Sequence, residues 1–375
     1  MIDWQRAFYW LLLAALIFLA LEQFADGLIE HAHAPMLDLA VYRSAVEGRP
    51  PVRGASGQML FVYHPLVLDM LRLLGGQFVL KMLMVYAGLL LLYGATVREI
   101  PHWAFATFLG MSFSGIGVAA ITTGNVTPFL QLAILGLAAR GFDSRERRIA
   151  FLIAVAIATI VKPYMILTAL IPLGVSAARR ETLRPIVIEI AAMVGALIAV
   201  VGLYALVRPD ATAAFIAALR TQTLTQGDLG IGVYGRLVHA IGEPAAMAAH
   251  LASIAAIAAI AIGSAWRQGR LTDPSFALLL FFLATIVNPR LQDYDLFPAL
   301  VALILYVLSA GGWRATAALL PAFIAAAIPL HGARFVDIET GFWPYAPNVY
   351  AVAMALLVLA LLSLPRLPQS PAARP

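Results

Sequence analysis

Apolar runs of roughly 15 to 23 residues follow one another along nearly the whole chain, and a run of about 20 is long enough for a helix to cross a membrane. Backbone amides cannot stay unpaired in hydrocarbon, and the runs lack the alternation of barrel strands, so the crossings are expected to be helices. Of the 375 residues, 62% are hydrophobic and only 12% are charged. The sequence therefore predicts an all-α polytopic integral membrane protein with one transmembrane domain over residues 1–375.

Basic residues fall between the apolar runs at intervals that suit pairs of crossings, and in membrane proteins they mark the cytoplasmic loops. These positions are 140–148, 179–184, 267–270, Arg6, Arg98, Arg314 and Arg366. Counting crossings between them predicts about twelve transmembrane helices with both termini in the cytoplasm. The expected helices are 7–24, 78–97, 103–121, 126–140, 149–161, 164–178, 185–207, 244–265, 273–289, 293–309, 315–330 and 347–364.

Charge parity also places the segments between the spans. Because Arg98 must be inside, the apolar stretch 61–74 is expected to be a non-crossing helix at the outer surface. The first outer loop is then 25–76, the second is 208–243, and 365–375 is a cytoplasmic tail. The first apolar run has no clear cleavage site, which favours a retained span.

Several residue types and motifs are absent from the sequence, and their absence excludes some kinds of site and substrate. The chain has no cysteine, which excludes disulfides, thiolate metal sites and cysteine nucleophiles. No P-loop, dinucleotide fingerprint or nucleophile elbow is present, so a cytosolic nucleotide is not the expected substrate. His31 and His33 have too unspecific a spacing to predict a metal site. The net charge of +5 comes with the cytoplasmic arginines and does not indicate a nucleic-acid partner.

Four polar constellations are expected on the outer side of the membrane. They are Asp38 with Tyr42, Arg43, Tyr63 and His64; Thr122 to Asn125; Lys162 with Pro163 and Tyr164; and Asn288 to Asp295, which includes Arg290, Gln292, Asp293 and Tyr294. Each constellation alone is a weak signal. Their convergence on one face predicts chemistry at the membrane surface.

Asp38 admits two readings. A solvated loop acid is the plainer one. However, Asp38 and Tyr42 are four residues apart, which sets both on one face of a helix beside further polar groups. This spacing gives Asp38 a role as a general base.

Lys162 and Arg290 also admit two readings. Lys162 stands between two apolar runs, where a cation is expensive unless it has a function, although its long stem could also reach the outer interface. Its compact ammonium suits a phosphate group on a lipid. The planar guanidinium of Arg290 could bind phosphate oxygens at two points, and the same interfacial alternative applies.

Three other positions have weaker signals. His64 precedes Pro65, which fits the first turn of a helix, and it is either a packed histidine or a ligand for phosphate. Asn125 either caps the start of a span or binds a sugar hydroxyl. Arg236 lies in the second outer loop among hydroxyl, amide and aromatic groups, a mixture common both in sugar sites and in ordinary loops.

These residues resemble a known set, the bacterial polyprenyl-phosphate-dependent glycosyltransferases of the C-type (GT-C) fold. The resemblance is to the family that includes the phosphatidylinositol-mannoside mannosyltransferases and the branching arabinofuranosyltransferases. The matching pieces are 38–42 with Gly48, 61–66, Gly124 with Asn125, 161–163, 227–237 and 288–295. Together they span residues 38–298.

The resemblance implies an inverting transfer of a hexose, with mannose as the first expectation, from a polyprenyl-phosphate donor at the outer face of the bacterial inner membrane. Asp38 would be the base, and Lys162, Arg290, His64 and Tyr63 would contact the donor phosphate. The expected substrate-binding residues are Tyr42, Asn125, Asn288, Gln292, Asp293, Tyr294 and Arg236. The expected partners are membrane lipids and a glycolipid or glycan acceptor, with no metal or other cofactor.

The sequence departs from the family at one point, and two other classes compete. Many relatives have Ser-Pro followed by a Trp and paired His where this chain has Asn288-Pro289 and residues 292–295, so the donor sugar is uncertain. A transporter or flippase would have a similar number of spans, but the halves 1–180 and 185–364 show no repeat. A glycan ligase of another C-type family normally uses a larger basic outer loop than 208–243.

Overall fold

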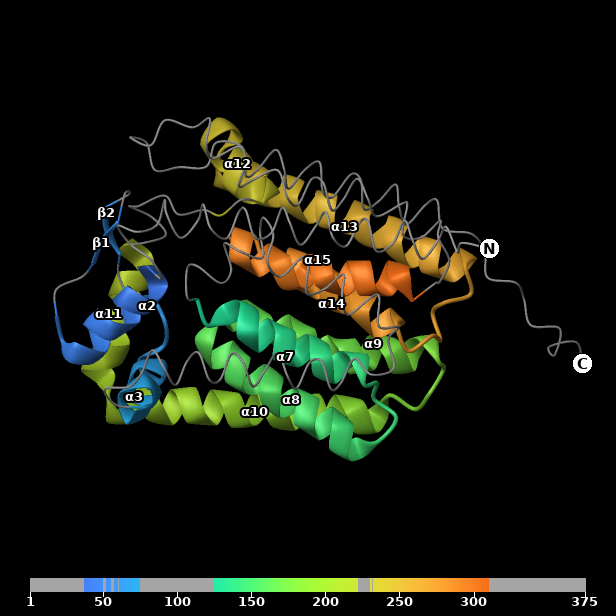
Figure 1. Cartoon of the computed structure of the whole chain (residues 1–375), viewed down its shortest axis with the longest axis horizontal. Coiled ribbons are helices and arrows are strands. Elements are labelled where there is room, and N and C mark those ends of the chain that lie inside the picture. The colour runs from blue at the N-terminus through green and yellow to red at the C-terminus, as the bar shows by residue number, and fades with distance from the viewer. Residues whose placement is uncertain are drawn as a thin grey trace, which may run out of the picture.

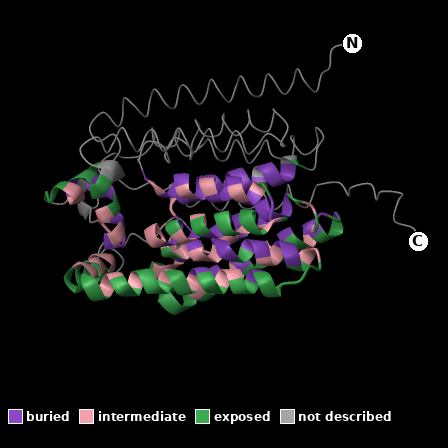
Figure 2. Cartoon of the chain, turned by 90° about the horizontal axis from the view of Figure 1, so that it is seen from below, coloured by how far each residue is buried: buried purple, intermediate pink, exposed green. Residues whose placement is uncertain are grey.

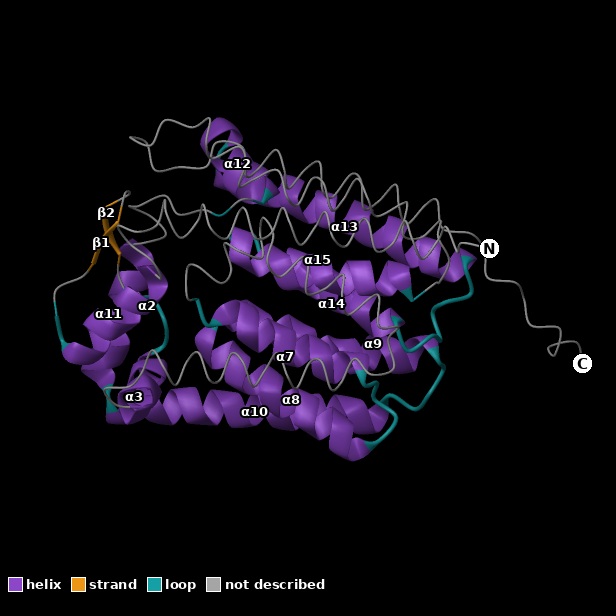
Figure 3. Ribbon diagram, viewed as in Figure 1, coloured by secondary structure: helices purple, strands orange, loops and turns teal. Residues whose placement is uncertain are grey.

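The structure is a computed structural model, and it describes residues 37–49, 52–54, 57–59, 61–74, 125–221, 230 and 232–309. This part of the chain is mostly helical, with one short hairpin (Figure 3). Its first elements are α2 (Leu37–Glu47), β1 (Val52–Gly54), β2 (Gly57–Met59), α3 (Pro65–Leu74), α7 (Thr127–Ala139), α8 (Arg145–Val161), the 3-10 helix η4 (Pro163–Leu170) and α9 (Ile171–Ala178). The later helices are α10 (Arg184–Val207), α11 (Pro209–Arg220), α12 (Val233–Ile241), α13 (Glu243–Arg267), α14 (Phe276–Ile286) and α15 (Asp293–Leu308).

The helices α7 to α10 and α13 to α15 lie side by side in a bundle (Figure 1). The helix α14 is apolar around its whole circumference, and such a helix is stable only when it is surrounded. It is accordingly buried on nearly all sides and packs against α7, η4, α9 and α15. Buried residues gather on these inner helices and exposed ones on the outer helices (Figure 2).

Local sequence signals explain where α8 begins and ends. The Ser144 side chain accepts a hydrogen bond from the Arg147 amide at 3.3 Å, which caps the first turn. At the other end, Pro163 disfavours helical geometry at Lys162, which is extended with φ −136° and ψ 104°. The expected helices 149–161 and 164–178 are therefore separate, and the second consists of η4 followed by α9.

Two helices in the described part, α10 with 24 residues and α13 with 25, are long and apolar enough to cross a membrane. At 1.5 Å per residue each is about 36 to 38 Å long, against roughly 30 Å of hydrocarbon. Large apolar side chains of α10 face outward, including Ile198, Leu203 and Leu206. An outer surface of this kind fits lipid better than water.

The expected helices 126–140, 149–161, 164–178, 185–207, 244–265, 273–289 and 293–309 all correspond to observed helices or helix pairs. About twelve spans were expected, but among the described residues only α10 and α13 are long and apolar enough to cross a membrane. The 13 residues of α7 and the 11 of α14 reach about 20 Å and 17 Å, less than the hydrocarbon thickness. The expected helices 7–24, 78–97, 103–121, 315–330 and 347–364 lie outside the described residues, as do His31, His33, 122–124 and the tail 365–375.

The helix α3 accounts for most of the stretch 61–74. Its ten residues reach about 15 Å, half the thickness of the hydrocarbon, which is the length expected of a helix that does not cross. Pro65 opens it, where the missing amide hydrogen costs nothing. The Tyr204 hydroxyl on α10 donates to the Asp69 carboxylate at 2.6 Å and ties α3 to the bundle. This hydrogen bond lowers the pKa of Asp69.

Candidate functional site

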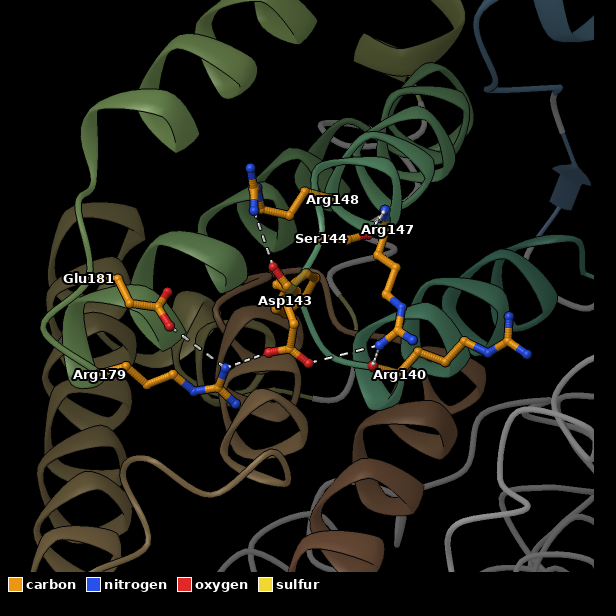
Figure 4. Close-up of polar contacts among 8 residues, drawn as sticks. Arg140, Asp143, Ser144, Arg147, Arg148, Arg179 and Glu181 are labelled. Carbon is orange, nitrogen blue, oxygen red and sulfur yellow. Dashed lines mark hydrogen bonds and ion pairs between the residues drawn. The ribbon is translucent and has the colours of Figure 1, made fainter.

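The bundle has two chemically different ends (Figure 1). At one end, which we call the arginine end, lie the connections 140–144, 179–183 and 268–275 between successive helices. Figure 4 shows the ion pairs there, in which Asp143 bridges Arg179 at 2.8 Å and Arg147 at 3.8 Å. At the other end, the α2 end, lie α2, the hairpin, α3, α11 and α12.

All four predicted constellations reach the α2 end where the structure describes them. Asn125 precedes α7, Lys162 follows α8, and residues 288–292 join α14 to α15. Tyr42 lies in α2, and Tyr63 comes just before α3. The chain thus brings together at one end residues that are far apart in the sequence.

A hydrogen-bonded cluster joins α2, the segment before α3 and the start of α7. The Tyr42 hydroxyl donates to the Tyr63 hydroxyl at 2.8 Å, and the Asn125 side-chain amide donates to the same oxygen at 3.0 Å. The two rings meet edge to face with their centres 5.3 Å apart. Tyr42 and Asn125 are each 1% exposed, so the cluster is part of the buried interior of the folded protein.

Lys162 completes this cluster from α8. Its ammonium lies 5.3 Å from the centre of the Tyr63 ring, within the range of a cation–π contact. The side chain is half-buried and belongs to the residue at which α8 is interrupted. We call Tyr42, Tyr63, Asn125 and Lys162 the tyrosine–lysine cluster.

Asn125 has both of the roles weighed from the sequence. Its side-chain oxygen accepts a hydrogen bond from the Thr127 amide at 2.8 Å, which turns the chain into α7. Its amide group at the same time reaches Tyr63. The helix start therefore orients the group that enters the tyrosine–lysine cluster.

A second polar contact chain lies next to this cluster. The Gln131 amide on α7 donates to the Tyr164 hydroxyl at 2.9 Å, and the same hydroxyl interacts with the Asp295 carboxylate on α15. Gln131 and Asp295 are 0% and 1% exposed. Asp295 also accepts a hydrogen bond from the Gln292 amide at 3.3 Å and so caps α15. Gln131 was not among the predicted site residues, although a lone amide in the apolar run 126–140 is a usable signal.

Two contacts hold the conformation of the turn 288–291, a hydrogen bond to the Asn288 side chain and the close approach of Gly230. The Asn288 side chain accepts a hydrogen bond from the Arg290 amide at 3.1 Å, so Asn288 shapes the turn after α14. Gly230 has φ +75°, and a Cβ there would lie 2.6 Å from the Leu291 carbonyl oxygen. Only a glycine at position 230 allows the chain to approach this backbone so closely.

Arg290 is half-buried and lies near Tyr234 of α12. Burial raises the pKa of Tyr234, as does the Glu243 carboxylate, while the positive charge of Arg290 acts in the opposite direction. Arg290 therefore places a cation at the α2 end, in the turn between α14 and α15.

His64 points away from the tyrosine–lysine cluster and is held as a packed histidine. Its ring lies 5.2 Å from the ring of Tyr204 and 5.7 Å from that of Phe215. The Leu66 amide donates to Nδ1 at 3.2 Å, so Nε2 carries the proton of the neutral ring. Burial lowers the pKa of His64, which keeps the ring neutral near pH 7. The packed-histidine reading fits this arrangement, and contact of His64 with a donor phosphate stays a prediction.

Four predicted positions can be placed only by their backbone. Asp38 is the second residue of α2, one helical turn before Tyr42 and thus on the same helix face. Arg236 lies in α12, and Asp293 and Tyr294 lie in the first turn of α15. All four belong to elements of the α2 end (Figure 1).

Replacing Tyr63 by Phe tests whether the cluster stabilises the fold. This change removes two buried hydrogen bonds, and we expect the free energy of unfolding to fall by about 1–3 kcal/mol. Tyr306→Phe is the matched control, because its buried hydroxyl has no hydrogen-bond partner among residues 125–221 and the other described segments. Chemical denaturation of the purified protein in detergent measures both, and equal effects would refute the role of the cluster.

Comparisons of the chain with protein-family models, curated proteins and solved structures found no match. The residues and geometry of the α2 end are therefore the basis on which a function can be inferred.

Proposed function

We propose that this protein is a membrane-embedded glycosyltransferase that moves a hexose, with mannose as the first candidate, from a polyprenyl-phosphate donor to an acceptor hydroxyl. The observation that carries the proposal is the tyrosine–lysine cluster, which joins four separate segments at one end of the bundle, one helical turn from Asp38. A carboxylate, hydroxyl and amide groups, and a cation are the groups that sugar transfer from a phosphate requires.

In the proposed reaction, the Asp38 carboxylate accepts the proton of the acceptor hydroxyl. The acceptor oxygen forms a bond to the anomeric carbon of the sugar while the bond from that carbon to the phosphate oxygen breaks. The configuration inverts, and polyprenyl phosphate leaves with the electron pair. Lys162 and Arg290 supply positive charge to the leaving phosphate.

The same end also offers groups for the sugar. Tyr42 and Asn125 bring hydroxyl and amide groups to the cluster, and Gln292, Asp293, Tyr294 and Arg236 belong to elements beside it. Asn288 contributes by shaping the turn that carries Arg290. The acceptor is a glycolipid or a glycan, and the proposed mechanism assigns no step to a metal.

The proposed setting is the bacterial inner membrane, in a C-type (GT-C) fold of about twelve crossings with the arginine end in the cytoplasm and the α2 end outside. The exposed apolar surface of α10 and the arginine-rich opposite end support this orientation. Short helices such as α7 and α14 would leave a recess in the outer leaflet, where a lipid-linked substrate could enter.

Single-cysteine labelling tests the orientation, because the chain has no native cysteine. We expect exposed Ala40→Cys in α2 to react with a membrane-impermeant maleimide on intact cells. Arg267→Cys, exposed at the arginine end, should react only after the membrane is opened. The reverse pattern would turn the proposed site to the cytoplasm and contradict the outer-face assignment.

A flippase remains the main competitor, and proteoliposomes with radiolabelled polyprenyl-phosphate-mannose separate the two functions. A transferase forms a labelled product in which the mannose is covalently attached to an added glycolipid acceptor. A flippase moves the intact donor between leaflets and leaves the label on polyprenyl phosphate. Movement of intact donor without product would replace the proposed function by transport.

A further inference from the structure

An apolar groove of about 430 Å³ lies between α8 and α10, and Ile160 at its far end also packs against the buried apolar cluster that includes Tyr42 and Tyr63. Both helices begin at the arginine end, so they run in the same direction (Figure 1). Ile149, Ile153 and Ile157 of α8 recur every four residues along one wall and are all exposed. From Ile149 to Ile160 the groove extends about 16 Å along the helix axis.

Among the described residues that line this groove, the charged ones lie at the arginine end. They are Arg145 and Glu189, and the remaining lining residues are apolar. Glu189 is already neutralised, because Arg148 bonds its two oxygens at 2.8 Å and 3.0 Å. Arg145 pairs with Glu189 less closely than Arg148 does. Its guanidinium lies 3.9 Å from the Glu189 carboxylate, and its side chain is 74% exposed.

The balance of these charges favours an anion at the mouth of the groove. Arg145 and Arg148 interact with Glu146 as well as Glu189, but over 140–148 and 179–189 seven arginines stand against four carboxylates, which leaves this end with a net positive charge. The N-termini of α8 and α10 lie at the same end, and the positive ends of their dipoles add to it. An apolar channel parallel to the helices with a cation at one end matches a molecule that has one anionic head and a hydrocarbon chain.

We propose that this groove is a binding site for an anionic phospholipid of the inner leaflet, with an acyl chain along α8 and α10 and its phosphate at Arg145. A zwitterionic lipid with the same chains would bind more weakly, because the positive charge of its own head group would lie near the arginines. This proposal depends on the chain lying in a membrane but not on the transferase reaction. Its test is a binding measurement, so it can succeed or fail separately from the proposed function.

Native mass spectrometry of the delipidated protein, titrated in detergent with phosphatidylglycerol or phosphatidylcholine of identical chains, provides the test. We expect phosphatidylglycerol to bind at least tenfold more tightly to the wild type, and Arg145→Gln to remove this preference. Ile157→Trp should weaken both lipids by filling the groove, and its exposed position permits folding. Thermal unfolding of each variant verifies that the fold is retained.

Arg267→Gln is the matched control, because Arg267 is an exposed arginine at the same end but on α13, outside the groove. If Arg267→Gln lost the preference for phosphatidylglycerol to the same extent, the lipid would be attracted to the arginine end as a whole, and the proposed site in the groove would be overturned. Equal binding of both lipids would overturn the role of the head group. Competition by glycerol phosphate alone would indicate a free-phosphate site, and failure of the wild type to bind either lipid would mean that the groove has another occupant.

Discussion

Asp38→Asn is expected to lower the turnover of sugar transfer by about 10²- to 10⁴-fold, the range that general-base catalysis typically contributes. The amide keeps the size of the side chain but cannot accept the acceptor proton. Because Asp38 is in the first turn of α2, one turn before the buried Tyr42, the change should leave the tyrosine–lysine cluster in place. Initial rates with saturating donor and acceptor measure the effect.

Glu47→Gln is the matched control for this experiment. Glu47 is also a carboxylate on α2, but it lies at the last residue and pairs at the surface with Arg43 at 3.0 Å and Arg49 at 2.8 Å. Exposed pairs of this kind contribute little to stability, so both turnover and folding should be retained. A loss of turnover equal to that of Asp38→Asn would mean that any charge removed from α2 impairs the protein, and Asp38 would lose its assigned role.

Gly230→Ala is expected to lower the free energy of unfolding by about 2–4 kcal/mol, from the left-handed backbone and from overpacking. The added Cβ would meet the Leu291 carbonyl oxygen at 2.6 Å and the Arg290 carbonyl carbon at 2.7 Å, and neither is a flexible side-chain end. The turn that carries Arg290 must then shift, so transfer should also fall. Denaturation in detergent and the transfer rate measure the two effects.

Gly195→Ala provides the comparison for that variant. It lies inside α10 with nothing within 4 Å of the new Cβ, and alanine favours a helix over glycine by about 0.5–1 kcal/mol. We expect unchanged or slightly higher stability and full activity. If Gly230→Ala behaved in the same way, the close approach of Gly230 to the turn 288–291 would not be a feature of the folded protein.

The helices of the described part follow closely from local signals in the sequence. Ser144 caps α8, Pro163 interrupts the run that includes Lys162, and Asn288-Pro289 ends α14 within a few residues of the expected position. These signals act over one or two turns, so a single sequence is enough to find them. The number of crossings does not follow from such local signals. Whether helices as short as α7 and α14 cross a membrane depends on the helices around them and on the local thickness of the membrane.

The candidate site was predictable in its location but not in its contacts. Charge parity placed Tyr63, Asn125 and Lys162 on one side, and they lie at one end of the bundle. The hydrogen bond between Tyr63 and Asn125 joins residues 62 positions apart, and nothing local specifies it. The same reason explains why Gln131 was missed and why the packing of His64 against Tyr204 and Phe215 did not follow from its place beside Tyr63 in the sequence.

The central claim is that the α2 end transfers a sugar from a lipid phosphate. It is tested most directly by incubating purified wild type and Asp38→Asn with radiolabelled polyprenyl-phosphate-mannose and a membrane lipid acceptor. Labelled acceptor and released polyprenyl phosphate are then counted. The proposal predicts equal amounts of the two products from the wild type and neither above background from Asp38→Asn. Equal transfer by both proteins would contradict the role of Asp38, and no transfer by the wild type from any of a panel of polyprenyl-phosphate sugars would contradict the proposed function.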